Sequence, residues 1–181
     1  MEQFNQNSES SRESSAFQFY QEDFGFTLDE LKDKKILDMP SGSDASFVKY
    51  CLKQGIDIIG MDGRELSDIP EDSEIKKHFV QGYAQDMPFK KESFDLILIR
   101  AMPVGAYWKI FQESLPLLKG GGILKWAPLF PETNSQHKAF LDRIISSQKE
   151  FGYSAEMSLV TIQKGKSGEF LRYCLTVRRQ P

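Results

Sequence analysis

The sequence predicts an α/β protein with a doubly wound, mostly parallel sheet of seven strands that ends in an antiparallel pair. From residue 35 onward, short apolar runs alternate with stretches of helical periodicity, which is the pattern of successive strand–helix–strand units. The last two extended runs flank a five-residue Gly/Lys loop at residues 164–168, which indicates a closing β-hairpin of strands six and seven.

The expected strands are apolar runs bounded by polar or turn-forming residues; they cover residues 36–38, 56–62, 78–80, 94–99, 123–126, 155–163 and 169–178. The run 94–99 is apolar almost throughout, as in a strand that a parallel sheet buries on both faces. Gly120, Gly121 and Gly122 are expected to form the turn that leads into the strand at residue 123.

The expected helices are stretches in which apolar residues recur on one face; they cover residues 47–52, 106–118 and 134–151. Gly55 is the stop signal of the first helix. The polar stretch 63–76 has room only for a short helix or a loop.

The N-terminal segment differs from the rest in composition. Residues 1–16 contain five serines and four Asn or Gln residues, so we expect a disordered tail there and a single domain over residues 17–181. Five aromatic residues then follow within residues 17–26. This aromatic segment either packs onto the domain or forms a flap over a ligand site, and the sequence leaves both interpretations open.

Composition bounds the environment and the partners. The 181 residues include 23 Lys and Arg against 26 Asp and Glu, a formal net charge of −3, which disfavours a nucleic-acid partner bound on a broad basic face. No membrane span or secretory signal is visible, so we expect a cytoplasmic protein without a membrane partner. Cys51 and Cys174 are expected as core residues, and no His/Cys/carboxylate cluster suggests a metal site. Nothing in the sequence specifies an oligomeric state.

The ligand site is expected at the carboxyl ends of the first two strands. Open α/β sheets bind ligands where the strand order reverses, usually beside the first strand. The loop from Asp38 to Asp44 contains small residues that let the backbone approach a ligand. Asp62 ends the second strand, where an acid can accept hydrogen bonds from both hydroxyls of a ribose.

Four segments in order carry a family resemblance: ILDMPSGSDASF, IIGMDG, GYAQDMPFKKESFDLILIR and LLKGGGILKW. Together they resemble the motifs of the class I S-adenosylmethionine-dependent methyltransferases, and most closely the small-molecule branch typified by ubiquinone and menaquinone C-methyltransferases. The resemblance spans about residues 35–126. It implies a Rossmann-like fold, S-adenosyl-L-methionine as cofactor and methyl transfer to a small-molecule acceptor.

The resemblance also implies cofactor-binding residues in the first loop and at the second strand. Asp38 matches the acid of the first motif, which helps to hold the methionine end of the cofactor, and Met39 and Pro40 continue this loop. Gly42 matches the middle glycine, where the backbone passes against the cofactor. Asp62 matches the ribose-binding acid, with Gly63 beneath the adenine.

Two further positions complete the set that the resemblance implies. Ala84 matches the residue whose backbone N–H faces the adenine, and Gln85 and Asp86 follow it. Arg100 ends the fourth strand, where backbone carbonyls often contact the ammonium of the cofactor.

The chain departs from the family pattern at three positions. Pro40 and Asp44 replace the first and third glycines, and Tyr83 replaces the aspartate that commonly bonds the adenine amino group. Asp86, three residues on, is the alternative for that role. Asp44 also has the simpler interpretation of a helix N-cap. These departures leave open a catalytically inactive, methyltransferase-like binding or partner module. An NAD-binding Rossmann enzyme is the third alternative, which the missing Gly-x-Gly-x-x-Gly spacing disfavours.

No catalytic residue is expected from the sequence, because methyl transfer from a sulfonium depends mainly on positioning. The acceptor is expected above strands four and five, near Met102, Tyr107, Trp108 and Trp126, although such aromatic residues more often belong to the core. His137 is a candidate general base, but its place in a polar helix start predicts a solvated side chain.

Overall fold

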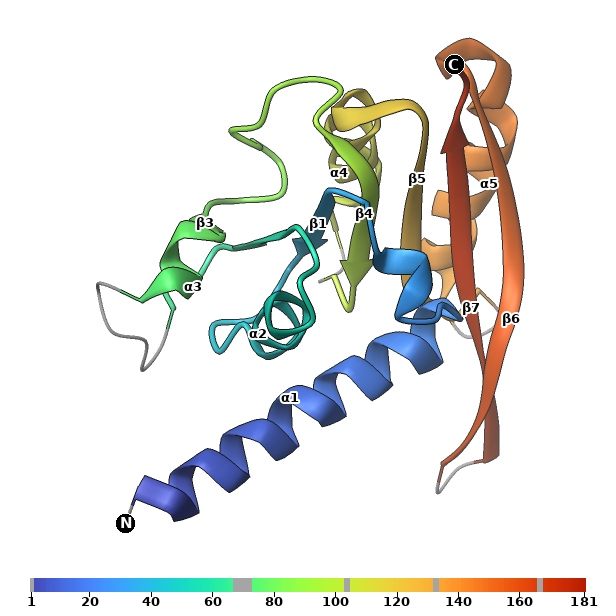
Figure 1. Ribbon diagram of the computed structural model, residues 1–181. Helices are drawn as coiled ribbons and strands as arrows, with labels where there is room; N and C mark the ends of the chain where they lie inside the picture. The colour runs from blue at the N-terminus through green and yellow to red at the C-terminus, as the bar shows by residue number, and fades with distance from the viewer. Residues whose placement is uncertain (1, 67–72, 103–104, 132–133, 166–167) are drawn as a thin grey trace.

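One seven-stranded sheet organises the chain, with strand order β3-β2-β1-β4-β5-β7-β6 (Figure 1). The computed structural model describes residues 2–66, 73–102, 105–131, 134–165 and 168–181. The strands are β1 (Ile36–Met39), β2 (Ile58–Asp62), β3 (Phe79–Gln81), β4 (Phe94–Arg100), β5 (Leu118–Leu129), β6 (Tyr153–Gly165) and β7 (Gly168–Arg179). The first five strands run parallel, whereas β7 pairs antiparallel with both β5 and β6, so the predicted fold class is confirmed.

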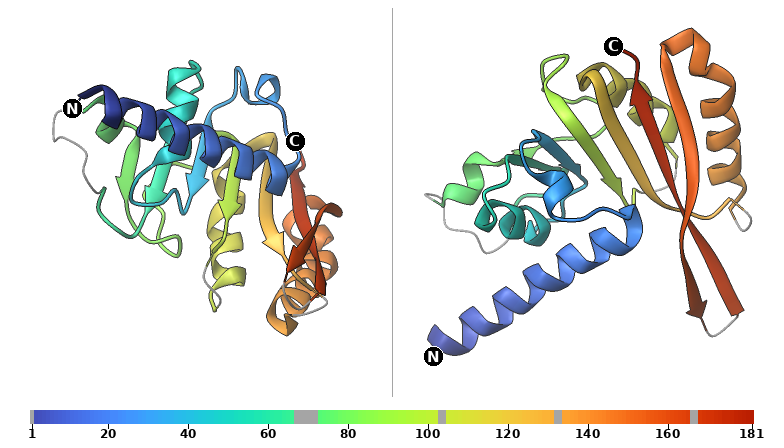
Figure 2. Two further views of the ribbon diagram at one scale, coloured as in Figure 1. Left: turned by 90° about the horizontal axis from the view of Figure 1, so that it is seen from below. Right: turned by 45° about the vertical axis from the view of Figure 1, so that its right-hand side comes forward.

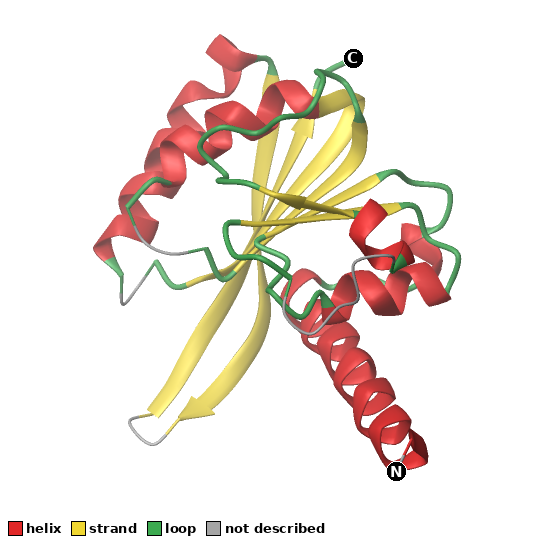
Figure 3. Cartoon of the chain, turned by 90° about the vertical axis from the view of Figure 1, so that its left-hand side faces the viewer, coloured by secondary structure: helices red, strands yellow, loops and turns green. Residues whose placement is uncertain are grey.

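The helices cover both faces of this sheet (Figure 3). They are α1 (Glu2–Phe24), α2 (Ser46–Lys53), α3 (Glu74–Lys77), α4 (Tyr107–Ser114) and α5 (Ser135–Phe151), with 3-10 turns at Asp29–Leu31 and Leu115–Leu117. The strand order reverses between β1 and β4, which places the predicted ligand site at the carboxyl ends of these strands.

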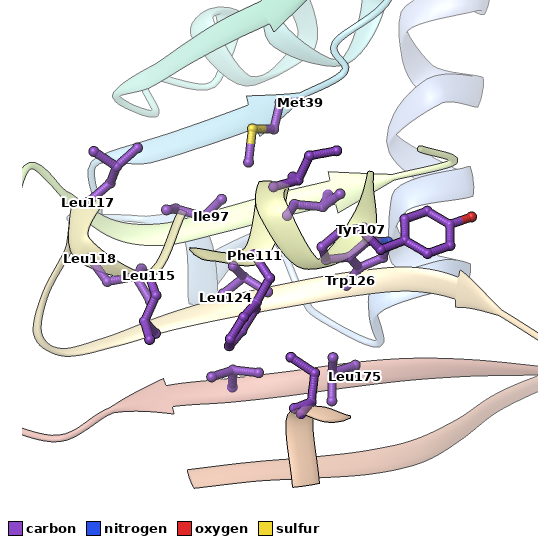
Figure 4. Close-up of a cluster of buried hydrophobic side chains, with 14 of the residues drawn as sticks. Met39, Ile97, Tyr107, Phe111, Leu115, Leu117, Leu118, Leu124, Trp126 and Leu175 are labelled. Atoms are coloured by element: carbon purple, nitrogen blue, oxygen red, sulfur yellow. The ribbon is translucent and has the colours of Figure 1, made fainter. Parts of the chain in front are cut away.

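Two apolar clusters form the core, one on each face. The first packs β4 and β5 against α4 and α5 around Phe111, Trp126 and Phe140 (Figure 4). The second packs the opposite face of the sheet against α1 and α2 and includes the predicted core residues Cys51 and Cys174, both free thiols. A sheet buried on both faces explains why its central strands read as continuous apolar runs.

Two element boundaries differ from the sequence prediction. The helix expected over residues 106–118 ends at Ser114, and a 3-10 turn that contains Pro116 follows it. Proline lacks the N–H that an α-helix needs, so the helical pattern cannot continue through this position. Strand β5 already begins at Leu118, and Gly120, Gly121 and Gly122 lie inside it, beside an irregular register with β4, instead of in a turn before it. The terminal hairpin is also longer than predicted, and residues 166–167 lie outside the described residues.

Helix α1 runs through the boundary that the sequence predicts between a tail and the domain. The view from below in Figure 2 shows α1 lying across the strands. Glu13, Phe17, Tyr20 and Phe24 recur at helical spacing and are all buried, so one face of α1 packs on the domain. The helical state of residues 10–16 therefore differs from the expected disorder, while the extent of the single domain stays a prediction.

Buried charges fix the C-terminal end of α1 to the sheet. The Asp23 carboxylate is fully buried and accepts hydrogen bonds from Arg100 Nε at 2.6 Å and from the Arg172 guanidinium. Arg100 ends β4 and Arg172 belongs to β7, so one side chain joins α1 to two strands. Lys125 Nζ adds a hydrogen bond to the Phe24 carbonyl at 2.7 Å.

We expect Asp23→Asn to lower the free energy of unfolding by about 3 kcal/mol, because two partly buried guanidinium groups would lose their counter-ion. Chemical denaturation followed by circular dichroism measures this difference. Asp142→Asn is the matched control, since the exposed ion pair of Asp142 with Lys138 contributes about 0.5 kcal/mol or less. Equal losses in the two variants would contradict the anchoring role of Asp23.

Candidate functional site

Asp38 lies at the carboxyl end of β1 and is completely buried beneath α1. Tyr20 Oη from α1 donates a hydrogen bond of 2.8 Å to Asp38 Oδ1, whereas Oδ2 has no partner among the described residues. Burial raises the pKa of Asp38 to about 8, although the Tyr20 hydroxyl and the Arg100 guanidinium favour the carboxylate. Asp38 is therefore a largely protonated acid at neutral pH.

Asp62 ends β2 and has the opposite character. Its Oδ2 accepts from the Gly42 N–H at 2.9 Å, and its Oδ1 accepts from the Arg64 N–H at 3.0 Å. The Arg64 side chain adds bonds from Nε to Oδ1 at 3.0 Å and from Nη2 to Oδ2 at 3.3 Å. Burial alone would raise the pKa of Asp62, but these hydrogen bonds outweigh it and hold the pKa below its usual value. Asp62 thus stays ionised and ties the first loop to the second strand.

The loop after β1 depends on a left-handed residue and a close approach. Gly42 has φ +78°, a conformation that favours glycine. Behind the loop, a Cβ atom at Gly60 would lie 2.8 Å from Val48 Cγ2 and 2.9 Å from Ser41 Oγ, so β2 and α2 pack tightly there. The sequence interpretation of Asp44 as the N-cap of α2 is wrong. Ala45 takes that position with φ +48°, and Asp44 instead accepts from Ser46 Oγ.

Two cavities of about 510 Å³ each open at this edge of the sheet and share Pro40, Arg64 and Ala101 in their walls. The first cavity lies between α1 and the β1 loop; its wall includes Arg12, Phe19, Tyr20, Ser41, Gly42, Asp44 and Arg100. The second lies above β2 and β3; its wall includes Met39, Asp62, Gly63, Tyr83, Ala84, Gln85 and Met102. The shared residues Pro40, Arg64 and Ala101 form a partition between the two cavities. Gly42 lines the first cavity and Asp62 the second, so the hydrogen bond between them joins the two sides of this partition.

Most of the site residues predicted from the sequence meet at these two cavities. Asp38 lies just below them, buried by Tyr20. Asp86 is the exception: its side chain is exposed and does not line either cavity, because the turn at residues 83–86 directs Gln85 toward the wall instead. The Arg100 side chain lines the first cavity and is held by Asp23.

Tyr83, which replaces the expected adenine-binding acid, lies on the rim of the second cavity. Its side chain is 73% exposed. A Cβ atom at Gly63 would lie only 3.1 Å from Tyr83 Cε1, so the ring packs directly against the glycine backbone. The glycine thereby makes room for an aromatic surface that can contact a planar ligand.

His137 does not behave as the sequence predicts. It is 7% exposed instead of solvated. The Phe130 N–H donates to His137 Nδ1 at 2.9 Å, so Nε2 carries the proton and lies 3.0 Å from Tyr107 Oη. Burial lowers the pKa of His137. Because Nδ1 already accepts a backbone hydrogen bond, this histidine orders the loop after β5 and has no free nitrogen for a general base.

The aromatic residues expected near an acceptor mostly belong to the core. Tyr107 and Trp126 are buried in the first apolar cluster (Figure 4). Phe140 belongs to the same cluster, while Met102 lines the second cavity. Of the aromatic segment 17–26, Phe17, Phe24 and Phe26 pack onto the domain, and Phe19 and Tyr20 line the first cavity. The packing interpretation of that segment is confirmed, and a flap over a ligand site stays a prediction.

Sequence reasoning missed Tyr20 and Arg64 as residues of the site. Arg64 directly follows the Asp62-Gly63 pair, and this adjacency was a signal that could have identified it. Tyr20 reaches Asp38 only because α1 folds across the sheet, and no local pattern reveals this contact. Among the described residues, no three His, Cys, Asp or Glu side chains gather as a possible metal site.

Comparison with known families gives one match. Residues 37–125 match a family model described as a methyltransferase domain. The matched segment extends from β1 into β5 and so contains Asp38, Gly42, Asp62 and Ala84. A search of curated proteins gives no match.

Solved structures share the fold at low sequence identity. A SAM-dependent methyltransferase from Methanosarcina mazei is 13% identical with a TM-score of 0.61, covering 82% of this chain and 93% of its own. The 1,6-didemethyltoxoflavin-N1-methyltransferase of Burkholderia thailandensis, solved with its substrate and S-adenosylhomocysteine, is 15% identical with a TM-score of 0.53, covering 82% and 72%. The [4+2]-cyclase SpnF is 13% identical with a TM-score of 0.54, covering 80% and 74%.

We expect Asp38 to make the stability of the protein depend on pH. Its folded-state pKa of about 8 lies above the unfolded value of about 3.9, so the folded state holds the extra proton between these values. The Asp38 contribution is therefore complete below about pH 4 and is lost as the pH rises through 8. Denaturation at pH 5.5 and pH 8.5 should show a larger loss in the wild type than in Asp38→Asn. The same loss in both proteins would assign the pH dependence to other groups.

Proposed function

We propose that this chain, in which residues 37–125 form a class I methyltransferase domain, transfers a methyl group from S-adenosylmethionine to a small-molecule acceptor. The match to a methyltransferase domain supports this activity. The Methanosarcina mazei relative is described as SAM-dependent, and the Burkholderia thailandensis enzyme was solved with S-adenosylhomocysteine, which supports S-adenosylmethionine as the cofactor. The binding residues and the acceptor class are our proposals. They rest on the convergence of the β1 loop, Asp62 and two adjoining cavities at the switch point of the sheet.

The residues present fit the adenosine half of the cofactor. Asp62 is an ionised acceptor on the wall of the second cavity, as two ribose hydroxyls require. Gly63, Ala84 and Gln85 line the same cavity, and Tyr83 offers an aromatic face for the adenine. We therefore assign these residues to the nucleoside and expect Asp86 to contribute little.

The first cavity fits the amino-acid half. Pro40 and Gly42 line it, and Asp38 and Ser41 each carry a buried oxygen without a partner among the described residues. Such orphaned polar atoms are typical of sites completed by a ligand or by water. We assign Asp38, Pro40, Gly42 and the end of β4 at Arg100 to the methionine end, whereas Met39 lines the second cavity instead.

The chemistry needs little from the side chains beyond positioning. Bound S-adenosylmethionine supplies an electrophilic methyl group. The protein contributes the cavity walls that orient the reactants, and α1 forms one wall of the first cavity. Tyr20 holds Asp38 in place, and no general base is assigned because His137 has no free nitrogen.

The acceptor is a small molecule in this proposal, because both cavities are of ligand size. Membership of the ubiquinone and menaquinone C-methyltransferase branch, the absence of a nucleic-acid or membrane partner and a cytoplasmic location stay predictions from the sequence. Among the helices of the described residues, none combines the length and apolar composition that crossing a bilayer requires.

A non-catalytic binding module is the second candidate. The observation that favours it is the Arg64 side chain, which already occupies the Asp62 carboxylate that the ribose would need. The similarity to a [4+2]-cyclase also indicates that this fold is compatible with other chemistry.

The binding of S-adenosylhomocysteine tests the proposed function. Isothermal titration should detect binding to the wild type, and Asp62→Asn should weaken it by about tenfold to 100-fold, because a charge-assisted hydrogen bond to the ribose is lost. Asp86→Asn is the matched control, since its exposed carboxyl lies outside both cavities, and it should change the affinity less than about twofold.

Three outcomes would contradict the proposal or part of it. Absence of any binding heat at millimolar ligand would remove the cofactor assignment altogether. Equal losses of affinity in Asp62→Asn and Asp86→Asn would show that the nucleoside does not use Asp62. Binding of S-adenosylhomocysteine without methyl transfer to any acceptor would favour the binding module.

A further inference from the structure

Arg64 lies between two acidic residues that belong to different cavities. Its guanidinium binds Asp62 through Nε and Nη2, at 3.0 and 3.3 Å. Asp62 raises the pKa of Arg64 most, and the charge of Asp44 across the partition raises it further. The Arg64 side chain is 68% exposed and lines both cavities. A rotation of this side chain from one cavity to the other would break its bonds to Asp62 but would not unpack the core.

In its observed position, Arg64 competes with a ribose. Asp62 accepts from two backbone N–H groups and from two nitrogen atoms of the Arg64 side chain. The backbone bonds belong to the loop and persist when a ligand binds. A ribose diol can reach the carboxylate only if the guanidinium leaves, and a charged group leaves at low cost only when it gains a new anionic partner.

The first cavity contains the place for such a partner, but also an obstacle. Asp44 lies on the wall beside Gly42, where its negative charge would repel the carboxylate of a bound amino acid. Arg100, on the same wall, is committed to the buried Asp23. A guanidinium that moves from Asp62 into this cavity would both neutralise Asp44 and bind the ligand carboxylate.

We propose that Arg64 is a specificity-determining residue that exchanges Asp62 for the carboxylate of the cofactor when the ribose binds. The residue then selects ligands that carry both a ribose diol and a carboxylate. Adenosine alone displaces the guanidinium and offers it nothing in return. This inference rests on the proposed function, because it assumes that the nucleoside occupies the second cavity.

Three ligands separate the steps of this exchange: S-adenosylhomocysteine, its decarboxylated analogue, and adenosine. In the wild type, S-adenosylhomocysteine should bind at least about tenfold more tightly than the decarboxylated analogue. In Arg64→Gln this ratio should fall to about threefold or less. The affinity for adenosine should rise about threefold to tenfold in the same variant, because Asp62 no longer has a competing cation.

Arg12→Gln is the matched control. It removes one positive charge from the same cavity, but no described contact joins Arg12 to Asp62. This variant should leave the affinity for adenosine unchanged and keep most of the preference for the carboxylate. Arg64→Gln also removes a partner of the buried Asp62 carboxylate, so its melting temperature should fall somewhat. Circular dichroism verifies that the variant is still folded at the temperature of the binding measurements.

The outcomes distinguish this inference from the proposed function. If Arg64→Gln binds adenosine no more tightly than the wild type does, Arg64 does not compete with the ribose for Asp62. If the affinity ratio between S-adenosylhomocysteine and its decarboxylated analogue is unchanged in this variant, Arg64 does not bind the ligand carboxylate. If Arg12→Gln loses the preference for S-adenosylhomocysteine over its decarboxylated analogue, Arg12 binds the ligand carboxylate, and the inference is overturned as well. Binding of S-adenosylhomocysteine only after Arg64→Gln would support the competition but overturn the exchange. No binding of any ligand to either protein rejects the proposed function and the inference with it.

Discussion

The ion pairs of Asp23 are the interaction on which the site depends. This carboxylate is fully buried, and it holds the end of α1 against Arg100 of β4 and Arg172 of β7. That link adds to the stacking of Tyr20 on Phe47 and fixes the end of α1 beside β4, where Tyr20 reaches Asp38. A charge buried with its partners costs much to break, so it gives a helix of mostly polar residues a definite position.

With α1 in place, two acids of similar sequence context acquire opposite properties. Asp38 loses water on all sides and becomes a neutral acid, with only one hydrogen bond among the described residues. Asp62 keeps its charge because two backbone N–H groups and Arg64 bind it. The end of β1 thus offers the neutral Asp38 beneath the first cavity, and the end of β2 offers the negatively charged Asp62 beside the second cavity. The difference arises from hydrogen-bond donors and burial, and neither is visible in the residue type.

The departures from the family pattern also make sense together. Pro40 and Asp44 remove two glycines from the first loop, yet Gly42 supplies a left-handed residue and the N–H that binds Asp62. Asp44 adds a negative charge near the amino-acid end, and Arg64 supplies a positive charge that can offset it. Tyr83 replaces an acid by a ring that packs on Gly63. A residue of the motif can therefore be replaced when another residue, close in space, supplies the backbone conformation or the charge that the replaced residue would have given.

From residue 35 onward, the sequence by itself determined the order of strands and main helices along the chain, the closing hairpin and the positions of Asp38, Gly42 and Asp62. Apolar periodicity and turn residues act over short distances, which is why these features could be predicted. The sequence could not determine the burial of His137, the contact of Tyr20 with Asp38 or the strand that includes the three glycines from Gly120. Each of these depends on residues at least seven positions away: Phe130 for His137, Asp38 for Tyr20, and β4 for the glycines. Such contacts form only when the chain packs, so tertiary structure alone decided which charges are neutralised and which stay available to a ligand.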